Sequence, residues 1–477
     1  MPNVPVSPQD TVERALAAGR PGGDLVVIAD EHSTVNLRWA GNTLTTNGVA
    51  STRSLTVIAI DRRADGGSGV GLVSRSGARP EAVEEIVREA EKAAADAPPA
   101  ADAGELARAD EARFASSSWE NDAASTEVGV LRGFAGQLGE TLRAAEAAGR
   151  KLYGFAEHEV TSTFLGASSG LRVRHDQPTG RLELNAKSAD LARSAWAGAT
   201  TRDFSDVDVP GLDASLAERL TWQSRRLDLP AGRYETLLPP AAVADLMINF
   251  YWSAGAREAA EGRSAFSRAG GGTGAGGTRV GERLSALPVS LFSDPGYPGL
   301  ECAPFVIAHS SGDDSSVFDN GLPSGRATWL SEGVLSALYS SRHSAALAGL
   351  AVTPAVDNLV LAGGTEHAGS LESMIASTKR GLLLTCLWYI RSVDPQTLLL
   401  TGLTRDGVYL IENGEVAGAV NNFRFNETPV GMLGRLLEAG ATERSTLPRE
   451  FSDYFTRTAM PPLRIEGFNM SSVSQAS

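Results

Sequence analysis

The stretch that decides the fold of this chain is residues 227–266, LDLPAGRYETLLPPAAVADLMINFYWSAGAREAAEGRSAF. It reads as a strand followed by a helix, around Tyr234–Phe250. It contains neither histidine nor cysteine, and the chain has no histidine at all between His175 and His309. The helix offers the apolar and aromatic side chains of Met247–Trp252. These side chains suit packing in a core better than catalysis or metal binding.

The composition is ordinary for a globular protein, with 42% hydrophobic and 21% charged residues. A chain of 477 residues is too long for one ordinary core, so we expect more than one domain. The net charge of −14 argues against a nucleic-acid surface, which needs a basic stripe. Residues 1–20 lack a signal-peptide pattern, no stretch has the apolar length of a membrane span, and Cys302 and Cys386 lie in apolar surroundings. We therefore expect a cytoplasmic protein with buried thiols and with neither a nucleic-acid nor a membrane partner.

The first half reads as an antiparallel sheet covered by helices. Residues 24–75 form five alternating apolar–polar runs, separated by turns at Gly41-Asn42, Asn47-Gly48 and Gly66-Gly67. Further strands are predicted over 153–164, 171–175 and 181–188, and helices over 10–18, 80–95, 125–148 and 213–226.

The second half, from Pro288 on, reads mainly as strands, with helices near 341–348, 370–377 and 429–438. Strand runs beside helix runs, without βαβ alternation, indicate an α+β protein built on antiparallel sheets that are flanked by helices. We predict an N-terminal α+β domain over 1–226. A mainly-β domain over 227–477 would then contain the helix of the opening stretch.

Three local patterns match enzyme motifs without their structural context. Gly272-x-Gly274-x-x-Gly277 follows a polar loop rather than a strand, which favours a flexible loop over a dinucleotide site. Ser168 precedes a strand rather than a helix, which favours a hairpin turn over a nucleophile elbow. His158-Glu159 lies in a strand pattern, which cannot present metal ligands four residues apart on one face.

Two acidic patterns leave a functional interpretation open. Asp313-Asp314 with Asp319 offers oxygen ligands for a hard cation, but the spacing lacks the calcium-loop pattern and favours a solvated turn. Glu366-His367 is a histidine–carboxylate pair in a glycine-rich loop. A surface or capping role is favoured there over catalysis.

Six segments, in order along the chain, resemble those of the TldD/TldE (PmbA) metallopeptidase family. They are 38–42 with 80–83, 168–171, 318–323, 328–335 with 344–345, 370–377 and 411–416. Each is loose by itself, but their order and spacing over nearly the whole chain are specific. The resemblance implies the two-domain architecture of that family.

The resemblance also exposes two departures. Catalytic TldD members carry His-Glu-x-x-x-His on a helix shortly before a Gly-x-Ser-Ala-Phe stretch. Counting back from Ser264–Phe266 places Met247, Ile248 and Trp252 at those positions. Catalytic members also take a cysteine ligand near the C-terminus, and residues 440–477 contain none. Zinc needs imidazole, thiolate or carboxylate donors, so the chain resembles the zinc-less TldE-type subunit, with no cofactor of its own.

By this resemblance the chain pairs with a zinc-binding TldD-like homologue. The pair would hydrolyse peptide or amide bonds of unfolded or modified peptides, or of a peptide-like natural-product intermediate. This chain would contribute no catalytic or metal-binding residue but one wall of a substrate channel. The candidates for the channel or interface are Trp252, Ser264, Phe266, Glu366 and His367.

Of these candidates, Trp252 is expected to be buried, so Trp252→Ala would weaken folding or assembly. Two other functions remain open. The first alternative is a stand-alone hydrolase with a non-zinc site such as Glu366-His367. The second is a regulatory or binding protein of the gyrase-modulator type.

Overall fold

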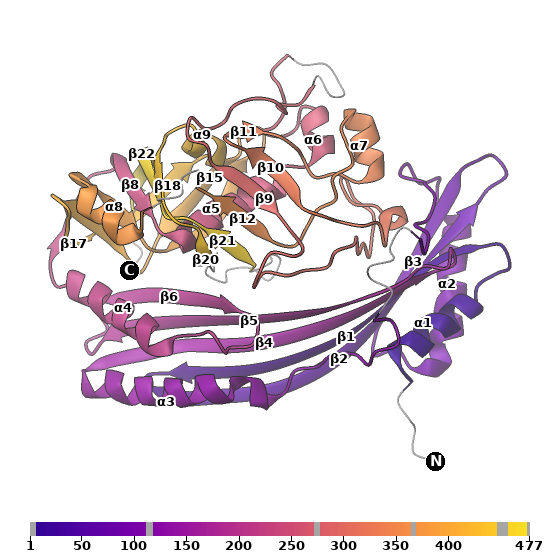
Figure 1. Ribbon diagram of the computed structural model, residues 1–477, viewed down its shortest axis with the longest axis horizontal. Coiled ribbons are helices and arrows are strands. Elements are labelled where there is room, and N and C mark those ends of the chain that lie inside the picture. The colour runs from indigo at the N-terminus through magenta and orange to yellow at the C-terminus, as the bar shows by residue number, and fades with distance from the viewer. Residues whose placement is uncertain (1–5, 111–117, 271–276, 364–368, 446–456, 475–477) are drawn as a thin grey trace.

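The protein is described here from a computed structural model that covers residues 6–110, 118–270, 277–363, 369–445 and 457–474. One long six-stranded sheet carries two further sheets over one of its faces (Figure 1). Helices flank these sheets, so the predicted α+β class is confirmed.

The long sheet is antiparallel throughout, in the order β3-β2-β1-β4-β5-β6. Its strands are β1 (Asp24–Ala40), β2 (Thr43–Arg62), β3 (Ser68–Ser76), β4 (Arg150–Ala167), β5 (Arg172–Ser188) and β6 (Ser194–Thr201).

The five short runs predicted over 24–75 are wrong in number, because two long strands and a shorter third occupy this region. Gly41 and Asn42, with φ of 58° and 67°, turn the chain between β1 and β2. Asn47-Gly48, predicted as a turn, instead pairs with β1 inside β2. The two strands predicted at 171–175 and 181–188 are likewise one strand, β5.

Four helices cover one face of the long sheet: α1 (Pro8–Ala17), α2 (Val83–Asp96), α3 (Arg132–Ala147) and α4 (Val209–Trp222). Alternate apolar residues of β1 point to them: Val27 packs with α1 and α2, and Leu37 packs with α3 and α4. The helix predicted to begin at 125 begins at Arg132, after a 3₁₀ turn at Val128–Leu131. The reason is that Thr126 donates its backbone N–H to Ser33 Oγ (2.9 Å), which ties that segment to the sheet.

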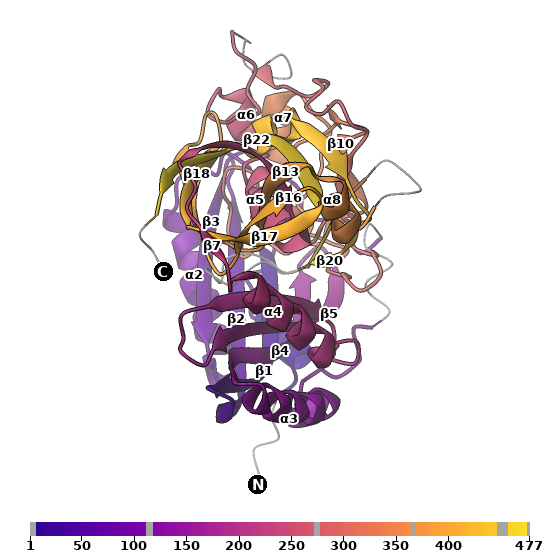
Figure 2. The same ribbon diagram turned by 90° about the vertical axis from the view of Figure 1, so that its left-hand side faces the viewer.

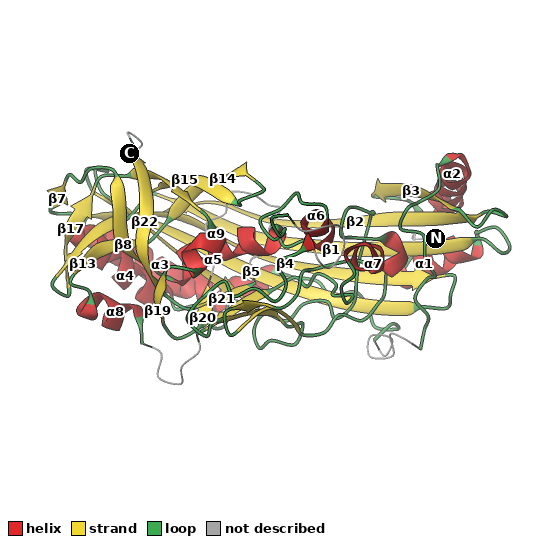
Figure 3. Cartoon of the chain, turned by 90° about the horizontal axis from the view of Figure 1, so that it is seen from above, coloured by secondary structure: helices red, strands yellow, loops and turns green. Residues whose placement is uncertain are grey.

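The opposite face of the long sheet meets the C-terminal half of the chain (Figure 2). Val26 and Ile28 of β1 pack there with Phe305 and Phe318. Figure 3 shows the C-terminal sheets over one half of the long sheet, with α1, α2 and β3 at the other end.

One C-terminal sheet has the order β11-β10-β9-β12-β21-β20, and the other has β14-β15-β18-β22-β8-β13-β16-β17-β7, with β19 beside β22. Most neighbouring strands are antiparallel, but β8 with β13, β7 with β17, and β12 with β21 are parallel. The strands are β7 (Arg226–Leu227), β8 (Gly232–Leu238), β9 (Ser290–Ser293), β10 (Ala327–Ser331), β11 (Val334–Leu335), β12 (Leu359–Ala362), β13 (Arg380–Leu384), β14 (Leu387–Asp394), β15 (Leu399–Thr404), β16 (Val408–Glu412), β17 (Glu415–Val420), β18 (Phe423–Glu427), β19 (Leu436–Ala439), β20 (Glu443–Ser445), β21 (Thr458–Met460) and β22 (Leu463–Val473).

The helices of this half are α5 (Pro240–Trp252), α6 (Ala256–Ala260), α7 (Arg342–Ala348), α8 (Leu371–Ser377) and α9 (Pro429–Leu433). The helix predicted over 429–438 ends at Leu433, because the chain continues as β19 and pairs with β22. Among the described residues, no helix is both long and apolar enough to cross a membrane.

Candidate functional site

Helix α5 lies at the centre of the C-terminal core, in contact with β8, β20, β21 and α9. Pro240 stands at its first position, where a missing N–H costs nothing. Ten of its thirteen residues are buried, including Met247 and Ile248. The helix is therefore surrounded by protein on nearly every side.

The end of α5 is fixed by aromatic contacts. Tyr251 donates its hydroxyl to the carbonyl of Val356 (3.0 Å) and accepts the N–H of the same residue (2.8 Å). Its ring packs on Trp329 at 5.2 Å, and burial raises the pKa of Tyr251 well above its usual value. Phe250 packs edge-on against Phe266 at 4.8 Å. These contacts give the helix a structural role.

Trp252 differs from the sequence-based expectation. Trp252 is 44% exposed, so the prediction that its indole is buried is wrong. Because α5 ends at Trp252, the packing that encloses Ile248 one turn earlier does not extend to it. Its carbonyl accepts the hydroxyl of Tyr339 (2.9 Å), which anchors the backbone while the ring faces the surface.

Of the other predicted candidates, the structure describes Ser264 and Phe266. Phe266 is fully buried, and Ser264 is buried with its hydroxyl accepting the N–H of Phe266 (3.2 Å). Both residues close the core around α5. Glu366 and His367 lie outside the described residues, as does most of the 272–277 glycine pattern.

Two further sequence patterns have structural roles. Ser168 lies in the tight turn between β4 and β5, as predicted, and its hydroxyl accepts the N–H of Leu25 (3.1 Å). The acidic pattern at 313–319 is divided among ion pairs and backbone contacts. Asp313 pairs with Arg263 (3.0 Å), and Asp319 pairs with Arg342 (2.6 Å). This arrangement does not converge on one cation.

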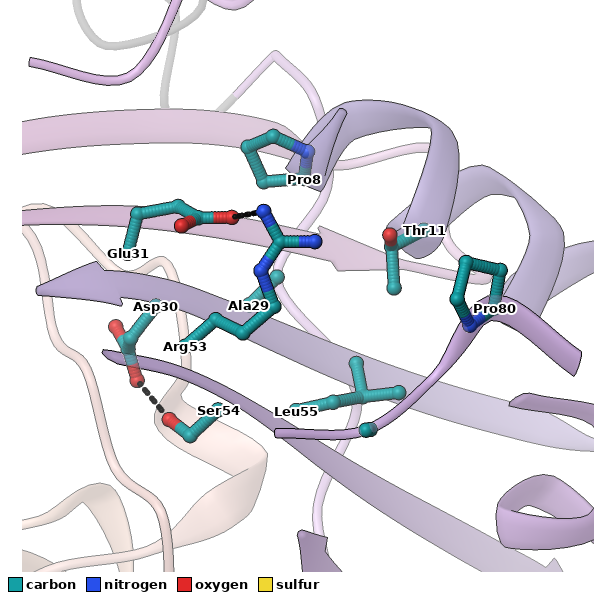
Figure 4. Close-up of a pocket in the computed structure, with 10 residues that line it drawn as sticks. Pro8, Thr11, Ala29, Asp30, Glu31, Arg53, Ser54, Leu55 and Pro80 are labelled. Carbon is teal, nitrogen blue, oxygen red and sulfur yellow. Dashed lines mark hydrogen bonds and ion pairs between the residues drawn. The ribbon is translucent and has the colours of Figure 1, made fainter. Parts of the chain in front are cut away.

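The hollow between α1 and the sheet is too small for a ligand (Figure 4). Its volume is about 20 Å³, little more than the space of one water molecule. Glu31 and Arg53 form an ion pair over it (3.0 Å). Burial raises the pKa of Glu31 against the opposing effect of Arg53.

The comparisons with known proteins identify the family. The model of the PmbA/TldA metallopeptidase C-terminal domain matches residues 231–472, just over half of the chain. The chain belongs to the PmbA/TldA metallopeptidase family. No curated protein matches it by sequence.

Solved structures share the fold over nearly the full length. TldE from Thermococcus kodakarensis superposes with a TM-score of 0.76 at 16% identity, covering 97% of this chain and 99% of that one. A Thermotoga maritima protein named as a modulator of a DNA gyrase gives 0.73 at 18% identity, with the same coverage. A similarly named protein from Bacteroides thetaiotaomicron gives 0.70 at 15%, covering 98% of both chains. The TldD/PmbA-type architecture predicted from the resemblance is thus confirmed.

In this family member, the residues at the three α5 positions named by the resemblance do not fit a zinc ion. A buried thioether, a buried alkyl chain and a surface indole stand at Met247, Ile248 and Trp252, and none is a zinc donor. Across the described ranges, no cluster of three histidine, cysteine or acidic residues is arranged to hold a metal. Burial raises the pKa of Cys302 to about 12 and that of Cys386 well above normal, which disfavours the thiolate that zinc requires.

A half-buried carboxylate pair on the long sheet was missed in the sequence analysis. Glu157 and Glu159 of β4 point to the same face, toward the C-terminal half of the chain, and Glu157 forms an ion pair with Arg181 of β5. Burial and a hydrogen bond to Glu157 raise the pKa of Glu159 to about 7. The alternation of glutamates at 157 and 159 was a signal for such a pair. Only the pairing of β4 with β5, however, places Arg181 beside it.

That face also holds the polar contacts between the two halves of the chain. Arg457 donates to Thr179 Oγ1 (3.0 Å), Gln177 donates to the carbonyl of Glu301 (3.1 Å), and His309 lies 3.1 Å from an oxygen of Asp30. The carboxylate pair therefore belongs to the region between the halves.

Proposed function

We propose that this chain is a non-catalytic, TldE-type subunit that pairs with a zinc-bearing TldD-type homologue in the cytoplasm. The observation that carries the proposal is helix α5. It is packed as a core element, and the three positions where the resemblance places zinc chemistry carry no donor.

In the proposed pair, the partner would hold the zinc, which would supply Lewis-acid chemistry for amide hydrolysis, and a glutamate of the partner would serve as general base. This chain supplies one wall of the channel for a peptide or small amide, including intermediates of peptide-derived natural products. The exposed Trp252 provides an aromatic surface at the end of α5.

Strand β2 offers a surface for the partner. β3 pairs only with residues 54–62 of β2, so the outer edge of residues 43–53 is open in the described structure. Residues 43–52 contain no charge and no proline, the usual protections of an exposed edge. Leu44 and Val49 are 55% and 59% exposed there. These features support assembly through this edge.

The experiment is co-expression with a TldD-type chain, followed by size-exclusion chromatography, metal analysis and peptide hydrolysis. We expect a mixed complex that holds zinc only in the partner and loses hydrolysis when the His-Glu-x-x-x-His of the partner is mutated. One zinc per chain in this protein alone, or hydrolysis by this chain without metal, would contradict the proposal.

The assembly surface is tested with Val49→Lys, which places a charge on the open edge. We expect the affinity of the pair to fall at least about tenfold, because a lysine at a strand edge opposes pairing. Val128→Lys is the control, because Val128 is equally exposed at 61% but lies on the 3₁₀ turn before α3. Equal affinities of the two variants would exclude the β2 edge.

A further inference from the structure

An open cavity of about 750 Å³ lies between the long sheet and the largest C-terminal sheet. The long sheet contributes Asn185 and Lys187 from β5, and the C-terminal half contributes Arg226 of β7 and the β15–β16 turn at Arg405-Asp406. In Figure 1 this junction lies at the left, where β6 and β17 approach each other. The volume is in the range of sites for small organic molecules.

The charge on the cavity wall is positive, although the chain carries −14 overall. Lys187, Arg226 and Arg405 line it against one carboxylate, that of Asp406. Asp406 pairs with Arg405 (3.4 Å) and also accepts the hydroxyl of Ser194, so it balances one of the three cations.

The other two cations have no carboxylate partner among the described residues. Lys187 Nζ lies 5.7 Å from the centre of the Tyr153 ring, and Arg226 donates to the carbonyl of Ala192 (3.2 Å). Neither contact neutralises a positive charge. Positively charged side chains that line a cleft focus the electrostatic field there and attract an anion. Asn185, two residues before Lys187 on the same face of β5, adds amide donors.

The backbone at the cavity is also strained at two points. Leu191 (φ 61°) and Asp406 (φ 52°), one from each half of the chain, adopt the left-handed conformation that residues with a side chain rarely adopt. Leu191 is in addition 53% exposed at the cavity rim. Both residues lie in tight turns between neighbouring strands, β5–β6 and β15–β16.

We infer that this cavity binds a small organic oxyanion, a carboxylate or a phosphate, between Lys187 and Arg226. Lysine supplies a point charge, and arginine supplies a planar fork that matches either oxyanion. A ligand bound there contacts both halves of the chain, so its binding stabilises their arrangement. The inference does not depend on zinc, on the partner or on hydrolysis.

The test is calorimetric titration of the full chain at constant ionic strength, with succinate, inorganic phosphate and neutral succinamide. We expect saturable binding of succinate or phosphate and none of succinamide. The anion that binds more tightly decides between the carboxylate and phosphate chemistries. The same anion should raise the melting temperature.

The double variant Lys187→Met/Arg226→Met should bind at least about tenfold more weakly, because two charge-assisted contacts are lost. Lys92→Met/Arg88→Met on the exposed face of α2 removes the same charges elsewhere and should leave binding unchanged. If the cavity variant does not fold, each single variant replaces it, and the ligand-induced rise in melting temperature is compared within each protein. Absence of saturable binding, or equal weakening in both double variants, would overturn the inference.

Discussion

The half-buried pair of Glu157 and Glu159 makes the stability of the long sheet depend on pH. A hydrogen bond between two carboxyl groups requires one proton, and Glu159 holds it because burial and Glu157 raise its pKa from 4.5 to about 7. Glu157 forms an ion pair with Arg181 of β5. Between about pH 4.5 and 7 the folded chain therefore binds more protons than the unfolded chain, and stability falls as the pH rises through this window.

The size of the effect follows from the same values. The rise in the pKa of Glu159 from 4.5 to about 7 corresponds to at most about 3.4 kcal/mol of folding stability, at about 1.36 kcal/mol for each pKa unit. Glu159 is partly exposed, and solvent screening reduces this to about 1–2 kcal/mol. Glu159→Gln keeps a neutral donor toward Glu157 and cannot ionise. The difference in free energy of unfolding, Glu159→Gln minus wild type, should therefore increase by about 1–2 kcal/mol from pH 5 to pH 8.

The assay is urea unfolding at a series of pH values, followed by tryptophan fluorescence. Trp39 and Trp196 are buried in the long sheet and report on it. Glu140→Gln on the exposed face of α3 is the control and should show no such change. A second variant, Glu157→Gln, removes the neighbouring carboxylate, so the loss of stability should move to lower pH. A difference between wild type and Glu159→Gln that stays constant from pH 5 to 8 would refute the reasoning.

Three further changes test other parts of the structure. Trp252→Ala should alter the free energy of unfolding by no more than about 0.5 kcal/mol, because the residue is 44% exposed; a drop in melting temperature of several degrees would restore a packing role. Asp319→Asn should destabilise the chain by about 2–4 kcal/mol in urea unfolding, because Arg342 loses a nearly buried partner, whereas Asp313→Asn in a solvent-exposed ion pair should cost under about 1 kcal/mol. Neither Cys302 nor Cys386 should react with Ellman's reagent at pH 8 before unfolding, since burial raises the pKa of both thiols; a fast-reacting thiol in the native protein would contradict their burial.

Local sequence was sufficient for the features that depend on neighbouring residues. The apolar spacing of 80–95 predicted α2, the stretch around Tyr234–Phe250 predicted the β8–α5 unit, and the strand pattern after Ser168 predicted a hairpin turn. The identities of Met247, Ile248 and Trp252 already showed that these three positions carry no zinc donor, because donor chemistry is a property of the side chain itself.

Tertiary structure decided everything that depends on what lies beside a residue. The apolar character of Trp252 predicted burial, but exposure is set by where α5 ends and by what covers it. Asn47-Gly48 has the composition of a turn, yet pairing with β1 holds it in a strand. The placement of Glu157 beside Arg181, and of Lys187 and Arg226 on the wall of one cavity, arises from strand pairing and from the contact between the two halves. Contacts between residues far apart in sequence leave no local pattern, so only the folded chain brings these charges together.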